Sequence, residues 1–309
     1  MNTQTLLDFK PVTAADRAAY DERLFRSSER GSEFSFANLY FWGEQSLCPF
    51  EDGYLIFARF GGRSMYYFPL VDACHERAAI DATLADAAAR GIPYCITGMG
   101  LDARARMEAL YPDRFRYVEN DGAHDYVYAI DDLADLLGKK YDGKRNHVHR
   151  FEAEHPAYIV EPIRKDNLGA VREMAASWYR ARLEKDPDAD FQSEERALYR
   201  ALDDFDALAL EGILLSDGDA VLAFTVASRL AADTFDVHFE KARADVTGAY
   251  AVINYRFARY LREKYPAVRY LNREEDMGIA GLRRAKQSYH PHHLARKCWA
   301  LPKESCDEK

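Results

Sequence analysis

Three ionisable side chains alternate along residues 233–241, a segment whose aromatic and β-branched content predicts a strand. Because strand side chains alternate between the two faces of a sheet, we expect Asp236, His238 and Glu240 to share one face. In a cleft, His238 or Glu240 has the chemistry of a general base, since burial and nearby charges tune the pKa of such groups. On a face that meets water, the same row is a set of solvated charges, and the sequence leaves both interpretations open.

A polar turn follows this strand and leads into a long predicted helix, Ala249–Lys264. Gly248 is small enough for backbone N–H groups to approach a ligand, and the helix dipole favours an anion at this end. Lys241 and Arg243 add positive charge nearby. We therefore expect the turn to bind a phosphorylated donor, although a plain strand–turn–helix connection is the alternative. The expected donor-binding residues are Val246, Thr247, Gly248, Ala249 and Tyr250.

A second polar cluster, residues 272–276, follows the next predicted strand at its carboxyl end, where open mixed sheets often bind ligands. We expect an acceptor cleft here. Its predicted lining is Asp236, Asn272, Glu274 and Glu275. Tyr289 ends the helix that follows, and we expect it to protonate the leaving group. The alternative for Tyr289 is a ring packed in the core.

One basic segment, residues 139–150, stands out in an otherwise acidic chain. On a helix, its lysines share one side by their spacing of four residues. Lys140, Lys144 and Arg145 are therefore candidate contacts for nucleic-acid phosphates, whose binding would weaken with salt. The alternative is a solvated helix between domains. His292 and His293 have no partner at metal-ligand spacing, so we expect no metal site.

Composition limits the class of protein. At 309 residues the chain exceeds what one core usually serves, and its 48% hydrophobic content is globular. The net charge of −9 argues against a protein coated in nucleic acid. Five scattered cysteines without a C-x-x-C pair favour a reducing compartment and no structural zinc. The chain shows neither a secretory signal pattern nor an apolar run of about 18–20 residues, so we expect a cytoplasmic protein without integral membrane association.

Both halves of the chain show one order of elements: three antiparallel strands, a helix, a strand, a helix and a strand. The three-strand sets are expected at 45–50, 54–60 and 64–69, and at 210–216, 220–230 and 234–240, with a last strand at 294–301. The halves share almost no residues, so the repeat is architectural. We expect an α+β (mixed α/β) fold in two domains, 1–135 and 136–309, each a central mixed sheet flanked by helices.

The order of strand, polar turn, long helix, strand and helix ending in tyrosine resembles the GNAT acyltransferases. Several sequence motifs resemble more specifically the DUF2156 family, which is related to the C-terminal domain of phosphatidylglycerol lysyltransferase. These motifs are Thr247-Gly-Ala-Tyr250, Ile253-Asn254, Asn272-Arg-Glu-Glu-Asp276-Met-Gly278, Leu282-Arg-x-x-Lys286-x-Ser-Tyr289-x-Pro291, Phe34-Ser-Phe-x-Asn-Leu-x-x-Trp42 and Lys140-Tyr-x-x-Lys-Arg-Asn146. Together they span nearly the whole chain. Such proteins resemble tandem GNAT domains, as in the Fem-type aminoacyl transferases.

The resemblance implies an acyl- or aminoacyl-transferase that moves a group from a donor to an amine or hydroxyl acceptor. The donor would be acyl-CoA, as in GNAT enzymes, or an aminoacyl-tRNA, as in the Fem-type relatives, and no other cofactor is expected. Arg243 stands five residues before Gly248, so the usual GNAT phosphate motif is not present as such. In the expected mechanism, Glu240 or His238 deprotonates the acceptor and Tyr289 protonates the leaving group. The alternative is a non-catalytic ligand-binding module, or a degenerate transferase, that uses the same cleft.

Overall fold

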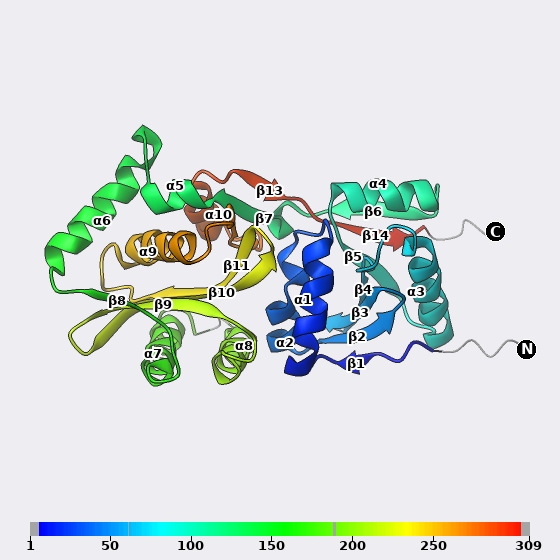
Figure 1. Cartoon of the computed structure of the whole chain (residues 1–309), viewed down its shortest axis with the longest axis horizontal. Helices are drawn as coiled ribbons and strands as arrows, with labels where there is room; N and C mark the ends of the chain where they lie inside the picture. The colour runs from blue at the N-terminus through cyan, green and yellow to red at the C-terminus, as the bar shows by residue number, and fades with distance from the viewer. Residues whose placement is uncertain (1–5, 61, 188–189, 304–309) are drawn as a thin grey trace, which may run out of the picture. The chain divides into compact units, whose positions relative to one another are not determined.

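The computed structural model describes residues 6–60, 62–187 and 190–303, which form two compact units (Figure 1). One unit comprises the chain up to Asp125 together with the segment from Ala295, and the other comprises Tyr126–Leu294. Each unit has one seven-stranded mixed sheet flanked by helices. The expected mixed α/β fold with two sheets is therefore confirmed.

In the first unit the strand order is β1-β2-β3-β4-β5-β14-β6. Strands β4 and β5 pair in parallel, and the other pairs that the described residues form are antiparallel. The strands are β1 (Lys10–Pro11), β2 (Gln45–Phe50), β3 (Gly53–Phe60), β4 (Arg63–Tyr67), β5 (Tyr94–Met99), β6 (Phe115–Glu119) and β14 (Cys298–Pro302). The helices are α1 (Arg17–Arg26), α2 (Phe36–Trp42), α3 (Glu76–Arg90) and α4 (Leu101–Leu110). Helix α3 ends at Gly91, which takes the left-handed conformation with φ of 62°.

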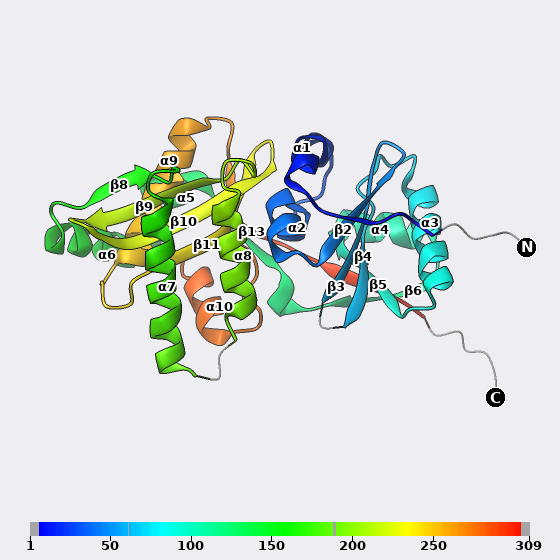
Figure 2. The same cartoon turned by 90° about the horizontal axis from the view of Figure 1, so that it is seen from below.

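In the second unit the strand order is β13-β7-β12-β11-β10-β9-β8. The strands are β7 (Asp125–Ala129), β8 (Ile159–Pro162), β9 (Glu211–Asp217), β10 (Ala220–Ala231), β11 (Thr234–Ala242), β12 (Tyr270–Asn272) and β13 (His293–Ala295). The helices are α5 (Ile130–Asp135), α6 (Asp142–Glu154), α7 (Leu168–Lys185), α8 (Gln192–Asp203), α9 (Ala249–Lys264) and α10 (Ala280–Gln287). Helices α7 and α8 lie side by side on one face of this sheet and α9 lies on the other (Figures 1 and 2).

Helix α9 shows how the sequence builds this layer. Its buried residues include Ile253, Phe257 and Leu261, whose spacing of four residues forms one apolar stripe. That stripe packs with residues of β7, β10, β11 and helices α5 and α6 in one core. Arg262 lies in the last helical turn, where a cation favours the dipole, and it pairs with two carboxylates of α5.

Two expectations about the fold are wrong. The division between units falls at residues 125 and 126, before the expected join at 135, because β7 pairs with β12 and α5 packs on α9. The strand expected at 294–301 is two strands, β13 and β14, which belong to different sheets. Both errors have one cause, since the pairing partner of an isolated apolar strand cannot be read from its own residues.

Candidate functional site

A β-bulge interrupts β11 at His238. Val226 of β10 pairs with Phe239, but the next residue, Ala227, pairs with Val237, so His238 is an extra residue on its strand. The bulge reverses the alternation of side chains. Asp236 is therefore paired with Ser228, whereas Glu240 is paired with Thr225, three residues earlier on β10. Ser228 and Thr225 project to opposite faces, so the expectation that Asp236, His238 and Glu240 share one face is wrong.

On the α9 side of the sheet, the Glu240 carboxylate is the centre of a polar cluster. Arg273, the first residue after β12, donates from Nη2 to Glu240 Oε1 at 2.8 Å, and Asn254 of α9 donates to Oε2 at 3.3 Å. The Glu240 and Arg273 side chains are only 11% and 14% exposed. β12 ends at Asn272 while β11 continues to Ala242, so this ion pair fills the region where the two parallel strands part.

Three polar atoms around this ion pair have no hydrogen-bond partner among the described residues. They are Thr225 Oγ1, Asn254 Oδ1 and Arg273 Nη1. Thr225 and Asn254 are 0% and 3% exposed, so water does not reach their side chains freely. An unmade hydrogen bond at a buried polar atom costs about 1–3 kcal/mol. Such a group of buried donors and acceptors around a charged pair is typical of a site that completes its hydrogen bonds with a ligand.

Lys144 of α6 and Tyr289 complete the cluster. Lys144 Nζ lies 3.7 Å from the centroid of the Tyr289 ring and donates to Ser288 Oγ at 2.7 Å. Burial lowers the pKa of Lys144 to about 8, and the nearby Arg273 guanidinium acts in the same direction against the attraction of Glu240. Burial raises the pKa of Tyr289 to about 12, so this phenol keeps its proton at neutral pH. The cluster thus holds a lysine that can lose a proton near neutral pH and a phenol that can donate one.

The other face carries a separate cluster around His238, whose side chain is 1% exposed. Its Nε2 lies 2.8 Å from Ser228 Oγ. Its Nδ1 lies 3.5 Å from Asp236 Oδ2 and 3.3 Å from Glu274 Oε1. The predicted cleft residues Asp236 and Glu274 therefore meet at His238 and not at Glu240.

The segment after β12 is held by its own hydrogen bonds. Asn272 Oδ1 accepts from the Glu274 N–H at 2.8 Å, and Glu274 has a φ of 56°. The Asp276 carboxylate is buried and accepts from Tyr126 and Arg283, and the Arg283 hydrogen bond holds the pKa of Asp276 at about 2. Asp276 therefore fixes the segment that presents Arg273 and Glu274.

The predicted donor turn contains the N-terminus of α9. Gly248 is in the left-handed conformation with φ of 87°. A Cβ at Gly248 would lie 2.7 Å from the His147 carbonyl oxygen of α6, so helix packing by itself requires a glycine here. Tyr250 is partly exposed and its hydroxyl accepts from the Trp178 indole at 3.2 Å. Donor binding at 246–250 remains a prediction.

The basic segment belongs to the second unit, where most of its charged side chains are exposed, whereas Tyr141 and Val148 join the core of that unit. Tyr141 and Phe151 are fully buried in that core. Lys140 pairs with Asp132 at 3.2 Å on the surface. Arg145 donates to the carbonyl oxygens of Leu136 and Gly138, so it stabilises its own loop. Of the three predicted phosphate contacts, the structure joins only Lys144 to the Glu240 cluster.

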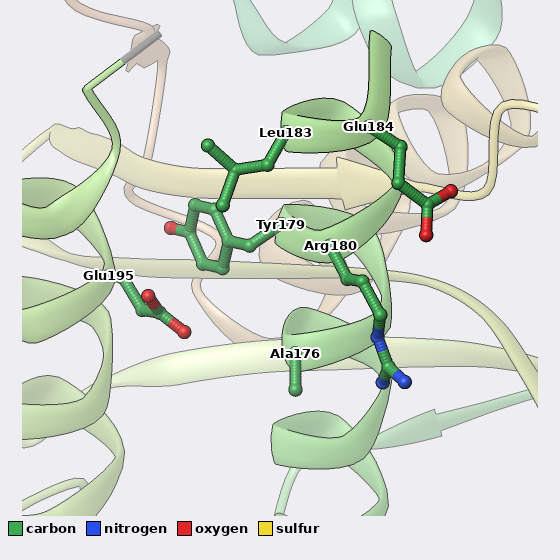
Figure 3. Close-up of a pocket in the computed structure, with 6 residues that line it drawn as sticks. All are labelled: Ala176, Tyr179, Arg180, Leu183, Glu184 and Glu195. Atoms are coloured by element: carbon green, nitrogen blue, oxygen red, sulfur yellow. The ribbon is translucent and has the colours of Figure 1, made fainter. Parts of the chain in front are cut away.

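A pocket of about 430 Å³ opens between α7 and α8 (Figure 3). Tyr179 and Leu183 extend from α7 towards α8, and Glu195 extends from α8 towards them, whereas Arg180 and Glu184 lie on the other side of α7. None of the predicted site residues lines this pocket.

Comparison with protein families identifies the chain. Residues 25–300 match the family model described as phosphatidylglycerol lysyltransferase, C-terminal. The protein belongs to this family. Within the part of the chain that the structure describes, no helix is long and apolar enough to cross a membrane.

Solved structures agree with membership of the lysyltransferase C-terminal family. A conserved protein of unknown function from Bacteroides thetaiotaomicron VPI-5482 is 35% identical over 96% of this chain and 100% of that one, with a TM-score of 0.91. L-PGS from Bacillus licheniformis is 16% identical over 94% of this chain and 92% of its own, with a TM-score of 0.69. FemX is 12% identical over 96% and 98%, with a TM-score of 0.59.

The last two similarities concern the fold alone. Together with the family match they show that this chain has the fold of the phosphatidylglycerol lysyltransferase C-terminal family. A search among curated proteins gave no match.

Proposed function

We propose that the second unit is an acyl- or aminoacyl-transferase whose reacting groups meet at the Glu240–Arg273 pair. The observation that carries the proposal is the set of unsatisfied buried atoms around this pair, at Thr225, Asn254 and Arg273. Among the residues that the structure describes, Arg273 Nη1 has no acceptor, so this cationic donor is available to a developing oxyanion. A closed structural ion pair would not need such open hydrogen-bonding positions beside it.

The reaction we propose is direct transfer. The acceptor amine or hydroxyl attacks the carbonyl carbon of the donor ester or thioester, and the carbonyl oxygen becomes an oxyanion near Arg273 Nη1. Neutral Lys144 or the Glu240 carboxylate takes the proton of the acceptor. When the tetrahedral intermediate collapses, the bond to the leaving group breaks and Tyr289 supplies its proton. His238 is less suited to be the base, because the bulge turns it to Asp236 and Ser228 on the other face.

The proposed positions of the donor and the acceptor rest on the chemistry of the site, and the proposed donor class rests on the family description. We place the donor at Val246, Thr247, Gly248, Ala249 and Tyr250. We place the acceptor beside the Glu240–Arg273 pair and not beside Asn272, because Asn272 is paired with Asp236 and so faces the other side of the sheet. The family description names a lysyltransferase, which favours an aminoacyl-tRNA over acyl-CoA as donor for this chain. Surface Lys140 is the candidate contact for a tRNA phosphate. An affinity that falls steeply with salt would support that contact.

A donor screen tests this function. Thermal unfolding of the protein is followed with lysyl-tRNA, other aminoacyl-tRNAs, uncharged tRNA and acyl-CoA, and each stabilising compound is then assayed for transfer to amine acceptors. We expect a charged donor to stabilise the protein and to turn over, and Tyr289→Phe to slow turnover without loss of donor binding. Stabilisation without turnover for any donor would favour a ligand-binding module, and no stabilisation at all would favour a degenerate transferase.

A further inference from the structure

We propose that Asp236, His238 and Glu274 form a binding site for a divalent cation of the Zn²⁺ or Mn²⁺ class. One ligand atom from each residue, Asp236 Oδ2, His238 Nδ1 and Glu274 Oε1, lies within 4.8 Å of the others. The three residues come from the bulge of β11 and from the segment after β12. This site is on the opposite face of the strand from Glu240 and is independent of the proposed transfer reaction.

The distances fit a common coordination sphere. Two ligands that each lie about 2.0–2.2 Å from a metal ion are separated by roughly 3.3–3.6 Å in a tetrahedral arrangement. His238 Nδ1 lies 3.5 Å from Asp236 Oδ2 and 3.3 Å from Glu274 Oε1. Three protein ligands would leave further positions for water or a substrate oxygen, as in metal sites that take part in binding or catalysis.

The imidazole is also oriented as a metal ligand is. His238 Nε2 lies 2.8 Å from Ser228 Oγ, a partner that is 5% exposed and fixed on β10. If Nε2 donates to Ser228, the lone pair of Nδ1 points at both carboxylates. A metal-bound histidine almost always uses its second nitrogen in this way, because the outer hydrogen bond sets the tautomer and the ring plane.

Charge and burial favour a cation at this point. Asp236 is 0% exposed, and the Glu274 side chain is 25% exposed, which leaves one open side to solvent. With a neutral imidazole, two carboxylates give the site a charge of −2, and burying such a charge is costly without compensation.

The ligand types favour borderline divalent ions. Imidazole suits Zn²⁺, Mn²⁺ and Fe²⁺, whereas Mg²⁺ and Ca²⁺ prefer sites made of oxygen alone. The competing explanation is a proton, which would make His238 an imidazolium held between Asp236 and Glu274. The two explanations differ in one measurable quantity, the stoichiometry of bound metal.

Metal binding to the full chain tests the proposal. The protein is stripped with a chelator, and Zn²⁺, Mn²⁺ and Mg²⁺ are titrated by calorimetry and by thermal unfolding, with bound metal measured by elemental analysis. We expect one equivalent of Zn²⁺ or Mn²⁺ and a higher Tm, with Mg²⁺ much weaker. Asp236→Asn, His238→Gln and Glu274→Gln should each lower the affinity by at least about tenfold to a hundredfold.

Glu275→Gln is the matched control, because it removes the neighbouring carboxylate and leaves the three ligands in place. It should bind metal as the wild type does. Circular dichroism of the metal-free variants establishes that they remain folded, and Glu274→Gln, at the most exposed ligand, is the variant least able to disturb packing. The proposal is overturned if the stripped protein shows no saturable binding of either ion, or if Glu275→Gln weakens binding as much as Glu274→Gln does.

Discussion

Replacement of Lys144 by methionine should stabilise the protein while it slows transfer. In the folded protein, burial lowers the pKa of Lys144 from 10.5 to about 8, so the charged form is disfavoured in its position. This lowering of the pKa corresponds to a destabilisation of the folded protein by at most about 3.4 kcal/mol. Because the side chain keeps partial contact with solvent and donates to Ser288 Oγ, we expect Lys144→Met to raise the free energy of unfolding by about 1–2 kcal/mol at pH 7.

The difference in unfolding free energy between Lys144→Met and the wild type should depend on pH. Below pH 8 Lys144 is charged in both the folded and the unfolded protein, so the folded protein is destabilised by the full free energy of burying this charge. Between pH 8 and 10.5 the unfolded chain binds the extra proton, so wild-type stability rises relative to the variant. Urea unfolding at pH 7 and pH 9.5 measures this, with Lys139→Met at an exposed position as the control. A variant that is less stable than wild type at pH 7, or a difference that does not shrink at pH 9.5, would refute the reasoning.

Further predictions concern the same unit. Gly248→Ala should lower the free energy of unfolding by about 1–3 kcal/mol, because φ is 87° and the new Cβ would meet the His147 carbonyl. Urea unfolding without any donor measures this loss, and an unchanged unfolding midpoint would contradict the prediction. Asp276→Asn should cost about 1–2 kcal/mol at pH 7, since the Arg283 hydrogen bond holds the carboxyl pKa at about 2. That difference should vanish as pH falls from 3.8 through 2, which acid-titrated unfolding would show. The transfer rate of the wild type should rise with pH through about 8 as Lys144 loses its proton, and this rise should be missing in Lys144→Met.

Much of the fold follows from local sequence signals. Helix α9 has the predicted bounds, Ala249–Lys264, because its apolar stripe and the preceding glycine are both unambiguous. Strand β2 is also found at its predicted residues. The strands β13 and β14 were predicted as one, because their separation depends on which sheet each joins.

The candidate site was predicted in its parts but not in its grouping. Strict alternation put His238 beside Glu240, whereas one inserted residue in β11 places them on opposite faces. A bulge depends on the register with β10, which a single strand sequence does not contain. Lys144 was predicted as a phosphate contact, although it lies beside Tyr289, which is 145 positions later in the chain.

The metal candidate was also missed from the sequence. His238 and Glu274 are 36 residues apart, far from the short spacing by which ligand pairs are usually recognised. The parallel pairing of Asp236 with Asn272 brings the two segments together. The one signal in the sequence was the polar cluster at residues 272–276, which follows a predicted strand at its carboxyl end.

The most direct test of the transferase site is a single-turnover transfer assay with Glu240→Gln. The variant keeps the size of the side chain but removes the charge that pairs with Arg273, and Glu263→Gln on the exposed face of α9 is the matched control. With a donor identified by the screen above, we predict a transfer rate about 10²–10⁴-fold below wild type for Glu240→Gln and an unchanged rate for the control. A rate for Glu240→Gln within a few-fold of wild type would contradict the assignment of this site.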